Sequence, residues 1–111
     1  MEISTVEMKR CTVIRLSGRF DSTVTPELDA ELDRLLAANH FKLALNMAEV
    51  TYISSAALRT LMRTWKECRR YHRGDLHLAE VRPEVDRVLE LVGLRPSLTI
   101  YASEAEAVGS F

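Results

Sequence analysis

The stretch LALNMAEVTYISSAALRTLM, residues 43–62, changes from a nearly continuous apolar run to a pattern with helical spacing. Residues 41–47 are too few for a helix and nearly apolar on both faces, as expected of a central strand in a sheet covered by helices. After a connecting segment, apolar residues return every three or four positions and predict a helix stopped by Gly74: Leu58, Leu61, Met62, Trp65 and Cys68. This part of the chain therefore predicts a strand followed by a helix that starts near two adjacent serines.

The residues before this unit predict a hairpin and a helix. Residues 12–16 alternate between apolar and polar side chains like a strand, an earlier strand can pair with them, and Gly18 breaks the pattern. Residues 25–40 have helical spacing, and we expect Thr25 to cap this helix and Pro26 to occupy its first position. One face of the helix carries four leucines that should point into the core: Leu28, Leu32, Leu35 and Leu36.

The residues after the central unit repeat the alternation of strand and helix. They predict a strand, a helix, a last strand and a short helix capped by Ser103, at residues 75–80, 83–93, 98–102 and 103–108. Repeated alternation of this kind implies a largely parallel sheet. Together with the hairpin, the pattern predicts an α/β fold: one domain over residues 1–111, with a mixed, mostly parallel sheet packed with four helices.

Composition places the chain among ordinary globular proteins. Of its 111 residues, 47% are hydrophobic and 28% charged, and the formal net charge is −1. This balance argues against a nucleic-acid partner, and no apolar run reaches the length of a membrane span. The opening residues lack the apolar core of a signal peptide, and Cys11 and Cys68 lack a CxxC spacing, as expected of buried thiols in a reducing compartment. We therefore expect a cytoplasmic protein.

Motifs for catalysis, metal binding and cofactor binding are missing from the sequence. The two serines lack the GxSxG elbow of a serine hydrolase, and no histidine is linked to Ser55 by a motif. There is no HExxH, no Cys/His cluster and no Asp-rich calcium loop. The four glycines are scattered singly, whereas phosphate cradles group several glycines in one loop. We expect an interaction module without a catalytic residue, metal or cofactor.

Positive charge is concentrated in residues 59–73. This segment has six basic residues and one acidic residue, whereas residues 1–58 have six and eight, and residues 74–111 have three and seven. Such a band is usually the solvated face of a helix, and contact with an acidic partner is the alternative. Both interpretations stay open at this point.

The serines at the helix start also have two interpretations. In one they only cap the helix, because Ser54 in the cap position accepts a hydrogen bond from an otherwise unpaired backbone N–H. In the other, Ser55 lies in the first turn and points outward, where a phosphate would sit beside the positive end of the helix. A phosphate there would not melt the helix, so a switch would have to act by repulsion or desolvation at a partner surface.

Three stretches resemble the STAS domain, and within it the bacterial anti-sigma factor antagonists, over nearly the whole chain. They are LSGRFDSTVTPEL at residues 16–28, LALNMAEVTYISSAALRTLM at residues 43–62 and VDRVLELVGL at residues 85–94. The first is similar to the family's strand-ending Gly, here Gly18, followed by an Asp, here Asp21, and a helix start. The second is similar to the family's turn of Asp, Ser, a variable Ser/Thr/Ala, Gly and Leu into a helix. The third is similar to a helix that ends in Gly-Leu.

The resemblance implies a phosphoprotein that switches a partner interaction. Alignment on Leu58 places Ser55 on the serine that a partner kinase, itself an anti-sigma factor, phosphorylates in this family and that a PP2C-type phosphatase restores. Ser54 replaces the family's Asp, which keeps a capping side chain but removes a carboxylate. Ala57 replaces the family's Gly, which adds a methyl group where a kinase would approach. The partner-binding residues that the resemblance implies are Asp21, Ser22, Ser54, Ser55, Ala56, Ala57 and Arg59.

The leading hypothesis is an anti-sigma factor antagonist that docks on an anti-sigma factor serine kinase, releases a sigma factor, and is switched off by phosphorylation of Ser55. The alternative is a STAS module that binds constitutively in a sensor assembly or transporter complex, without a phosphoswitch. An enzyme or nucleotide-binding protein on the same fold is a third hypothesis. No nucleic-acid or membrane partner is expected, and a homodimer is left open.

Overall fold

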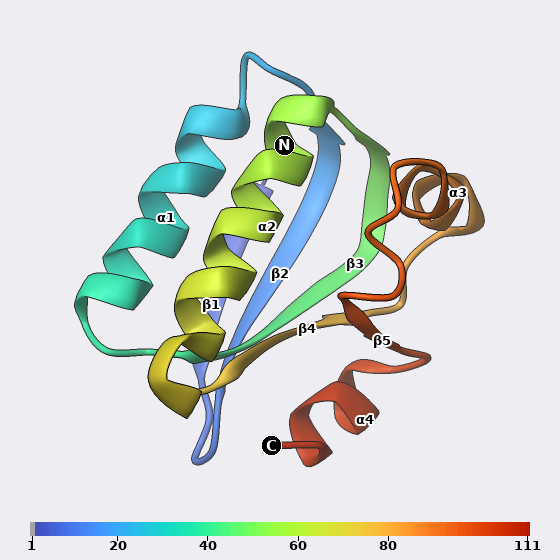
Figure 1. Cartoon of the computed structure of the whole chain (residues 1–111). Helices are drawn as coiled ribbons and strands as arrows, with labels where there is room; N and C mark the ends of the chain where they lie inside the picture. The colour runs from blue at the N-terminus through green and yellow to red at the C-terminus, as the bar shows by residue number, and fades with distance from the viewer. Residues whose placement is uncertain (1) are drawn as a thin grey trace.

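The sheet of the computed structural model, which describes residues 2–111, has five strands in the order β1-β2-β3-β4-β5 (Figure 1). The strands are β1 Glu2–Glu7, β2 Thr12–Phe20, β3 Lys42–Ile53, β4 Asp75–Ala79 and β5 Thr99–Tyr101. The helices are α1 Thr25–Ala37, α2 Ser55–Arg69, α3 Pro83–Leu91 and α4 Glu104–Gly109, with a short 3₁₀ helix, η1, at Arg70–His72. β1 and β2 are antiparallel, and all other neighbouring strands are parallel. The predicted α/β fold with a mixed, mostly parallel sheet is confirmed.

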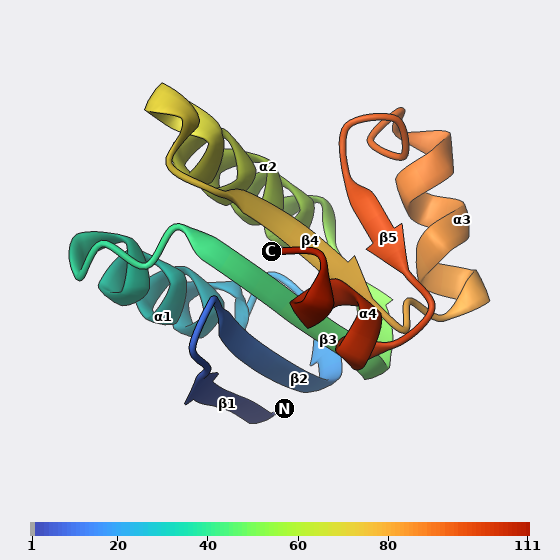
Figure 2. The same cartoon turned by 90° about the horizontal axis from the view of Figure 1, so that it is seen from below.

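Helices cover both faces of the sheet, and most of the core lies on one of them. α1, α2 and α3 pack on this face and share a single apolar cluster with the strands. The predicted face of α1 belongs to the cluster: Leu28, Leu32 and Leu35 are buried, and Leu36 packs against them. Figure 2 shows α4 on the opposite side of β3 and β4 from α2. A smaller cluster on that side consists of Cys11, Val13, Ala44, Ala79 and Ala107.

Both cysteines are buried, as predicted. Cys11 lies in the smaller cluster, and Cys68 lies on α2 in the main core. Burial raises the pKa of the Cys68 thiol to about 12, and it also raises the pKa of Cys11. Both thiols therefore stay protonated at neutral pH and act as small apolar side chains.

Two strands are longer than the sequence predicts. β3 continues to Ile53 and pairs with the end of β2, where Gly18 lies opposite Val50 and Phe20 lies opposite Ile53. Val50 and Ile53 are buried, while the polar residues between them face outward and make this half of the strand resemble a loop in sequence. Gly18 does not end β2. It has a φ of 103° at a shift in register, a conformation that glycine adopts without strain.

The helix caps are partly as predicted. Ser54 caps α2 and Ser103 caps α4, and each hydroxyl accepts a hydrogen bond from a backbone N–H three residues later. Thr25 is not the cap of α1, because it is already helical and Val24 occupies the cap position. The Thr25 N–H and hydroxyl both donate to the backbone carbonyl of Asp21, which fixes the loop before α1.

Gly74 is required by a close approach of two backbones. α2 ends at Arg69 and η1 leads to Gly74, where a Cβ atom would lie 2.0 Å from the carbonyl oxygen of Phe41. The neighbouring N–H of Asp75 donates to the same oxygen at 3.0 Å. The glycine thus stops the helical pattern and lets β4 start beside β3.

Candidate docking site around Ser55

Two connections meet at the edge of the sheet where the parallel strands end. The Ser54 N–H, at the start of α2, donates to the carbonyl oxygen of Phe20, the last residue of β2, at 2.9 Å. This bond joins the β3–α2 junction to the loop that carries Asp21 and Ser22. The carboxyl ends of parallel strands are the usual place for binding sites in open α/β sheets. The two segments singled out in the sequence, residues 18–22 and 54–59, therefore form one edge of the molecule.

Ser54 and Ser55 have different surroundings at the start of α2. The Ser54 hydroxyl accepts a hydrogen bond from the Ala57 N–H at 3.2 Å, as a capping side chain does. Ser55 is the first helical residue and its side chain is exposed. The first turn of α2 contains no acidic residue, so no side chain of the helix itself offsets the partial positive charge of its N-terminal end. The Ser55 hydroxyl is therefore exposed to solvent, whereas the Ser54 hydroxyl stabilises the start of the helix.

Asp21 is held as a carboxylate by its own loop. Its Oδ1 accepts hydrogen bonds from the Thr23 hydroxyl at 2.6 Å and from the Thr23 N–H at 3.0 Å. These bonds, the hydroxyl first, lower the pKa of Asp21 below its ordinary value. Asp21 is half-buried and the adjacent Ser22 is exposed. The loop thus offers a fixed negative charge and a free hydroxyl near the start of α2.

One residue of the predicted partner face lies in the core. The side chain of Ala57 is 0% exposed, because it points from α2 into the main apolar cluster. Its methyl group is not where a partner approaches, which corrects the expectation drawn from the family's glycine. Ser22, Ser55 and Arg59 are exposed, and Asp21, Ser54 and Ala56 are partly exposed.

An aromatic residue that was not predicted from the sequence lies on the same edge. Tyr52 lies near the end of β3 and is 41% exposed, and the Arg19 guanidinium lies 4.5 Å from the centre of its ring. Arg19 and Tyr52 are register partners on β2 and β3. Strict alternation would have placed Tyr52 on the same face as the buried Val50, but the register between β2 and β3 skips Thr51 and turns Tyr52 outward, so its exposure was not predictable from the sequence.

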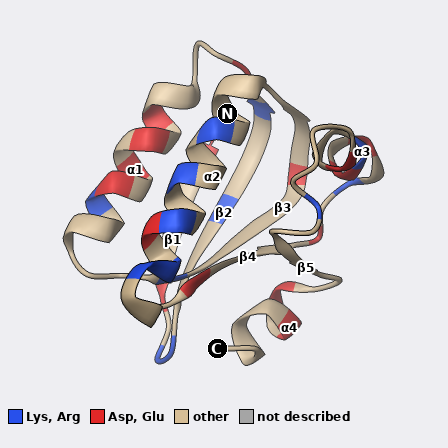
Figure 3. Cartoon of the chain, viewed as in Figure 1, with Lys and Arg blue, Asp and Glu red and all other residues tan. Residues whose placement is uncertain are grey.

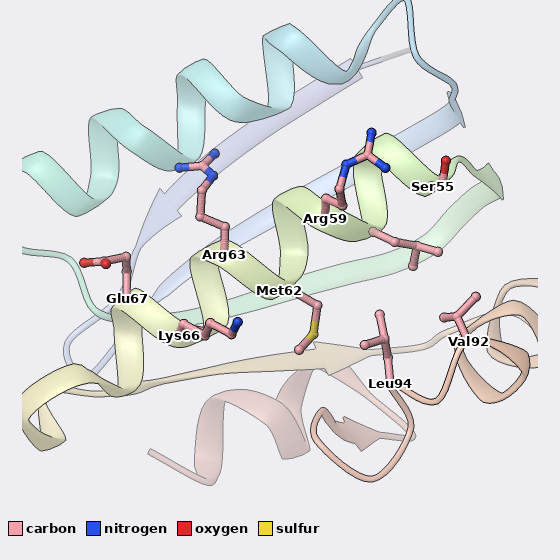
Figure 4. A pocket seen from close by; sticks show the side chains of 9 residues that line it. Ser55, Arg59, Met62, Arg63, Lys66, Glu67, Val92 and Leu94 are labelled. Carbon is pink, nitrogen blue, oxygen red and sulfur yellow. The ribbon is translucent and has the colours of Figure 1, made fainter.

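A groove of about 530 Å³ starts at Ser55 and follows α2. Its other wall is the segment after α3, which contributes Val92 and Leu94 (Figure 4). In the close view, Met62 of α2 points toward Leu94 across the groove. The residues that line it are Ser55, Leu58, Arg59, Met62, Arg63, Lys66, Glu67, Val92 and Leu94.

The basic band 59–73 does not form one continuous surface. Arg63 turns toward α1, where it pairs with Asp29 and Asp33, each at 2.7 Å, so that the acidic side of α1 faces the basic side of α2 (Figure 3). Other bases of the band pair with Glu67 and Asp75. Within residues 2–111, Arg59 and Lys66 have no carboxylate within 4.0 Å. Most basic side chains of the band therefore form ion pairs within the protein. Arg59 and Lys66 of α2 do not, and both line the groove.

A serine, a histidine and an aspartate meet on the other face of the sheet, which the sequence did not predict. The Ser110 Oγ lies 2.7 Å from the His77 Nδ1, and Asp75 lies 3.3 Å from its Nε2. The Ser110 hydroxyl also donates to the Ala107 carbonyl at 2.6 Å, and the Phe111 ring stacks on the imidazole at 4.2 Å. These contacts fasten α4 to β4 and cover the imidazole, so the group is structural in this arrangement.

The described part of the chain contains no group of three His, Cys, Asp or Glu side chains placed to hold a metal ion. None of the helices over residues 2–111 combines the length and the apolar character needed to cross a bilayer.

Comparisons with known proteins agree with this geometry. The STAS domain family model matches residues 2–107. The chain is 30% identical over 96 residues to the putative anti-sigma factor antagonist BtrV of Bordetella bronchiseptica, covering 86% of this chain and 82% of BtrV.

Solved structures show the same fold at lower identity. An anti-sigma factor antagonist from Mycobacterium paratuberculosis superimposes with a TM-score of 0.89 at 18% identity, over 98% of this chain and 92% of that one. The Bacillus cell fate determinant SpoIIAA in its phosphorylated form gives a TM-score of 0.77 at 19% identity, over 98% of both chains. The sheet order, the serine pair at the start of α2 and the match over residues 2–107 lead to one conclusion: the chain belongs to the STAS domain family, in which its relatives include proteins named as anti-sigma factor antagonists.

Proposed function

We propose that this protein is a cytoplasmic anti-sigma factor antagonist whose unphosphorylated form binds an anti-sigma factor serine kinase and thereby releases a sigma factor. Binding uses the Ser55 face, defined as Asp21, Ser22, Ser54, Ser55, Ala56 and Arg59. The single observation that carries the proposal is the exposed hydroxyl of Ser55 on the first residue of α2, next to a serine already used as the cap. Membership of the family and the likeness to BtrV support it.

Ser55 is the better phosphate acceptor of the two serines. A kinase needs the hydroxyl oxygen free to attack the phosphorus atom, and the Ser54 oxygen is engaged by the Ala57 N–H. A phosphate on Ser54 would also remove the cap that starts α2. A phosphate on Ser55 adds a charge of about −1.5 to −2 at a helix end that favours anions. A PP2C-type phosphatase would restore the neutral hydroxyl.

The switch acts at the interface and leaves the fold intact. Because α2 tolerates a phosphate at Ser55, the change in partner binding must come from repulsion or from the cost of burying a dianion against a surface shaped for a hydroxyl. The solved structure of SpoIIAA in a phosphorylated form, which has the same fold, is consistent with this mechanism.

The test is phosphorylation with ATP by each anti-sigma factor kinase encoded in the same genome, followed by mass spectrometry. We expect one kinase to bind the chain and to phosphorylate Ser55. The matched variants are Ser55→Ala, which should lose the phosphate, and Ser54→Ala, which should keep it. If no such kinase binds the wild-type chain, or if the phosphate appears on another residue, the proposal is wrong.

A constitutive STAS module in a sensor assembly or transporter complex is the second candidate. The observation that favours it is Ser54 in place of the family's Asp, which removes the carboxylate that directly precedes the acceptor serine in the chain. Comparison of Ser55→Ala with Ser55→Glu separates the two candidates. A phosphoswitch requires the Glu variant to bind its partner more weakly than the Ala variant, whereas a constitutive module binds equally in both forms.

A further inference from the structure

The groove beside Ser55 has an apolar interior. Leu58 and Met62 of α2 line one side of it. Val92 and Leu94 line the opposite side, across from Met62 (Figure 4). Val92 is 52% exposed, so its side chain is available at the surface of the groove. The interior thus offers apolar surface that a second chain could cover.

Among the charged side chains that line the groove, those without an intramolecular ion-pair partner are all positive. Arg63 is neutralised by Asp29 and Asp33, and Glu67 by Arg70 and Arg73 at 3.7 and 3.5 Å. Two lining cations are left, Arg59 and Lys66, which have no carboxylate within 4.0 Å over residues 2–111.

The spacing of these two cations suits an elongated ligand. Arg59 and Lys66 are seven residues apart on α2, which is about two turns or about 10 Å along the helix axis. A helix lying along the groove with its apolar face inward would present acidic residues to both cations at the same two-turn spacing.

We propose that this groove binds an acidic amphipathic helix of the partner protein, with apolar side chains against Met62, Val92 and Leu94 and carboxylates at Arg59 and Lys66. The inference rests on the proposed function for the identity of that partner, an anti-sigma factor. Its basis in the structure is the apolar interior and the two cations without an intramolecular partner.

The groove also connects docking to phosphorylation. Ser55 lines the end of the groove, and Arg59 follows it by four residues on the same helix, a spacing at which side chains are neighbours. A phosphate on Ser55 pairs with Arg59 and removes one of the two cations from the acidic helix. The remaining negative charge repels the same helix, so one modification weakens both parts of the interaction.

The first experiment needs no knowledge of the natural partner. The isotope-labelled chain is titrated with a designed amphipathic peptide of about 15 residues, with Leu on one face and Glu on the other, and with a control peptide that has Lys in place of Glu. We expect the acidic peptide to shift the NMR signals of Met62, Val92 and Leu94, and the Lys peptide to leave them unchanged. Equal shifts with both peptides, or shifts confined to another surface, overturn the proposal.

Two matched pairs of variants then test the residues. The double variant Arg59→Ala/Lys66→Ala should bind the acidic peptide about three- to tenfold more weakly. The double variant Lys9→Ala/Lys42→Ala loses the same net charge at the far end of β2 and β3, and it should bind like the wild type. Val92→Glu places a carboxylate in the groove and should abolish binding, whereas Leu91→Glu changes an 80% exposed neighbour that does not line the groove and should have no effect.

The same variants distinguish this inference from the proposed function. If the peptide binds the groove as expected but no anti-sigma factor binds the wild-type chain, the proposed function fails and the preference of the groove for acidic helices stands. If an anti-sigma factor binds the wild type and Val92→Glu, which lies outside the Ser55 face, binds it equally well, the proposed function stands and the groove is not its docking site.

Discussion

Ser54 and Ser55 have the same side chain but different surroundings, and we assign them different roles. The Ser54 hydroxyl is bonded to the Ala57 N–H, whereas the Ser55 hydroxyl is displayed on the first residue of α2. Substitutions at the two positions should therefore affect different properties of the protein.

Ser54→Ala should lower the free energy of unfolding by about 1 kcal/mol, because the α2 cap is lost. Ser54→Asp should restore most of it, since a carboxylate also caps a helix and is favoured at its positive end. Ser55→Ala should change stability by less than about 0.5 kcal/mol. Urea unfolding of the three variants measures these differences, and a larger loss for Ser55→Ala than for Ser54→Ala would contradict the assignment of the cap.

Ala57→Gly restores the residue that the family has at this position. It should lower the free energy of unfolding by about 1.5–2 kcal/mol, because glycine is a poorer helix former and a buried methyl group is removed. Partner affinity should not change, since the methyl group faces the core. Urea unfolding and a binding titration on the same preparation check both statements. Stronger partner binding by the glycine variant would show that position 57 reaches the interface after all.

Helix α2 combines a strong apolar face with a positive end that no acidic side chain of its first turn offsets. Its apolar residues were predictable from sequence because their spacing matches the helix, and its start was predictable because serine is a good cap. The pairing of Arg63 with Asp29 and Asp33 was not predictable, because it depends on how α1 packs beside α2.

Ser55→Asp tests whether α2 accepts a negative charge at its first residue. We expect the free energy of unfolding to rise by about 0.3–1 kcal/mol, because the carboxylate interacts with the helix dipole. Partner binding should become weaker in the same variant. Chemical denaturation and a binding titration give the two values, and high salt should reduce the gain in stability. A variant that loses both stability and binding would point to local unfolding and against a switch at the interface.

Helix α4 is attached to the sheet by an ion pair that responds to pH. Glu104 accepts two hydrogen bonds from Arg15, both at 2.9 Å, and a further one from Asn46. Chiefly because of Arg15, the pKa of Glu104 is lowered in the folded state. The ion pair therefore contributes fully to stability above the pKa that Glu104 has in the unfolded chain. This contribution is lost as the pH falls through the lower pKa that Glu104 has in the folded protein.

Glu104→Gln should remove part of the acid sensitivity of the fold. As the pH falls below the ordinary glutamate pKa, the free energy of unfolding of the wild type should fall by about 1 kcal/mol more than that of the variant. This figure is modest because Arg15 is nearly half exposed. Glu106→Gln on the same helix is the control, since Glu106 has no ion-pair partner within residues 2–111. Urea unfolding at pH values above and below that pKa provides the comparison. Parallel pH curves for the wild type and Glu104→Gln would contradict the role of the pair.

The fold as a unit was more predictable than its binding surface. Element type and order follow from local periodicity, and buried positions such as Leu32 and Leu61 follow from the same pattern. The second half of β3 was not predicted, because the register with β2 skips Thr51, which breaks the alternation and leaves both Thr51 and Tyr52 exposed. The groove joins Met62 to Leu94, which are distant in sequence and meet only through tertiary packing.

If Ser55 is a switch on a preformed surface, the most direct test is the dissociation constant of the partner complex, measured with and without the phosphate. The chain is phosphorylated quantitatively at Ser55, its unchanged fold is verified by circular dichroism, and its affinity for the anti-sigma factor is compared with that of the unphosphorylated chain by calorimetry. We expect a Kd at least about tenfold higher for the phosphorylated form, equivalent to about 1.4 kcal/mol of lost binding free energy. Equal dissociation constants for the two forms would contradict it.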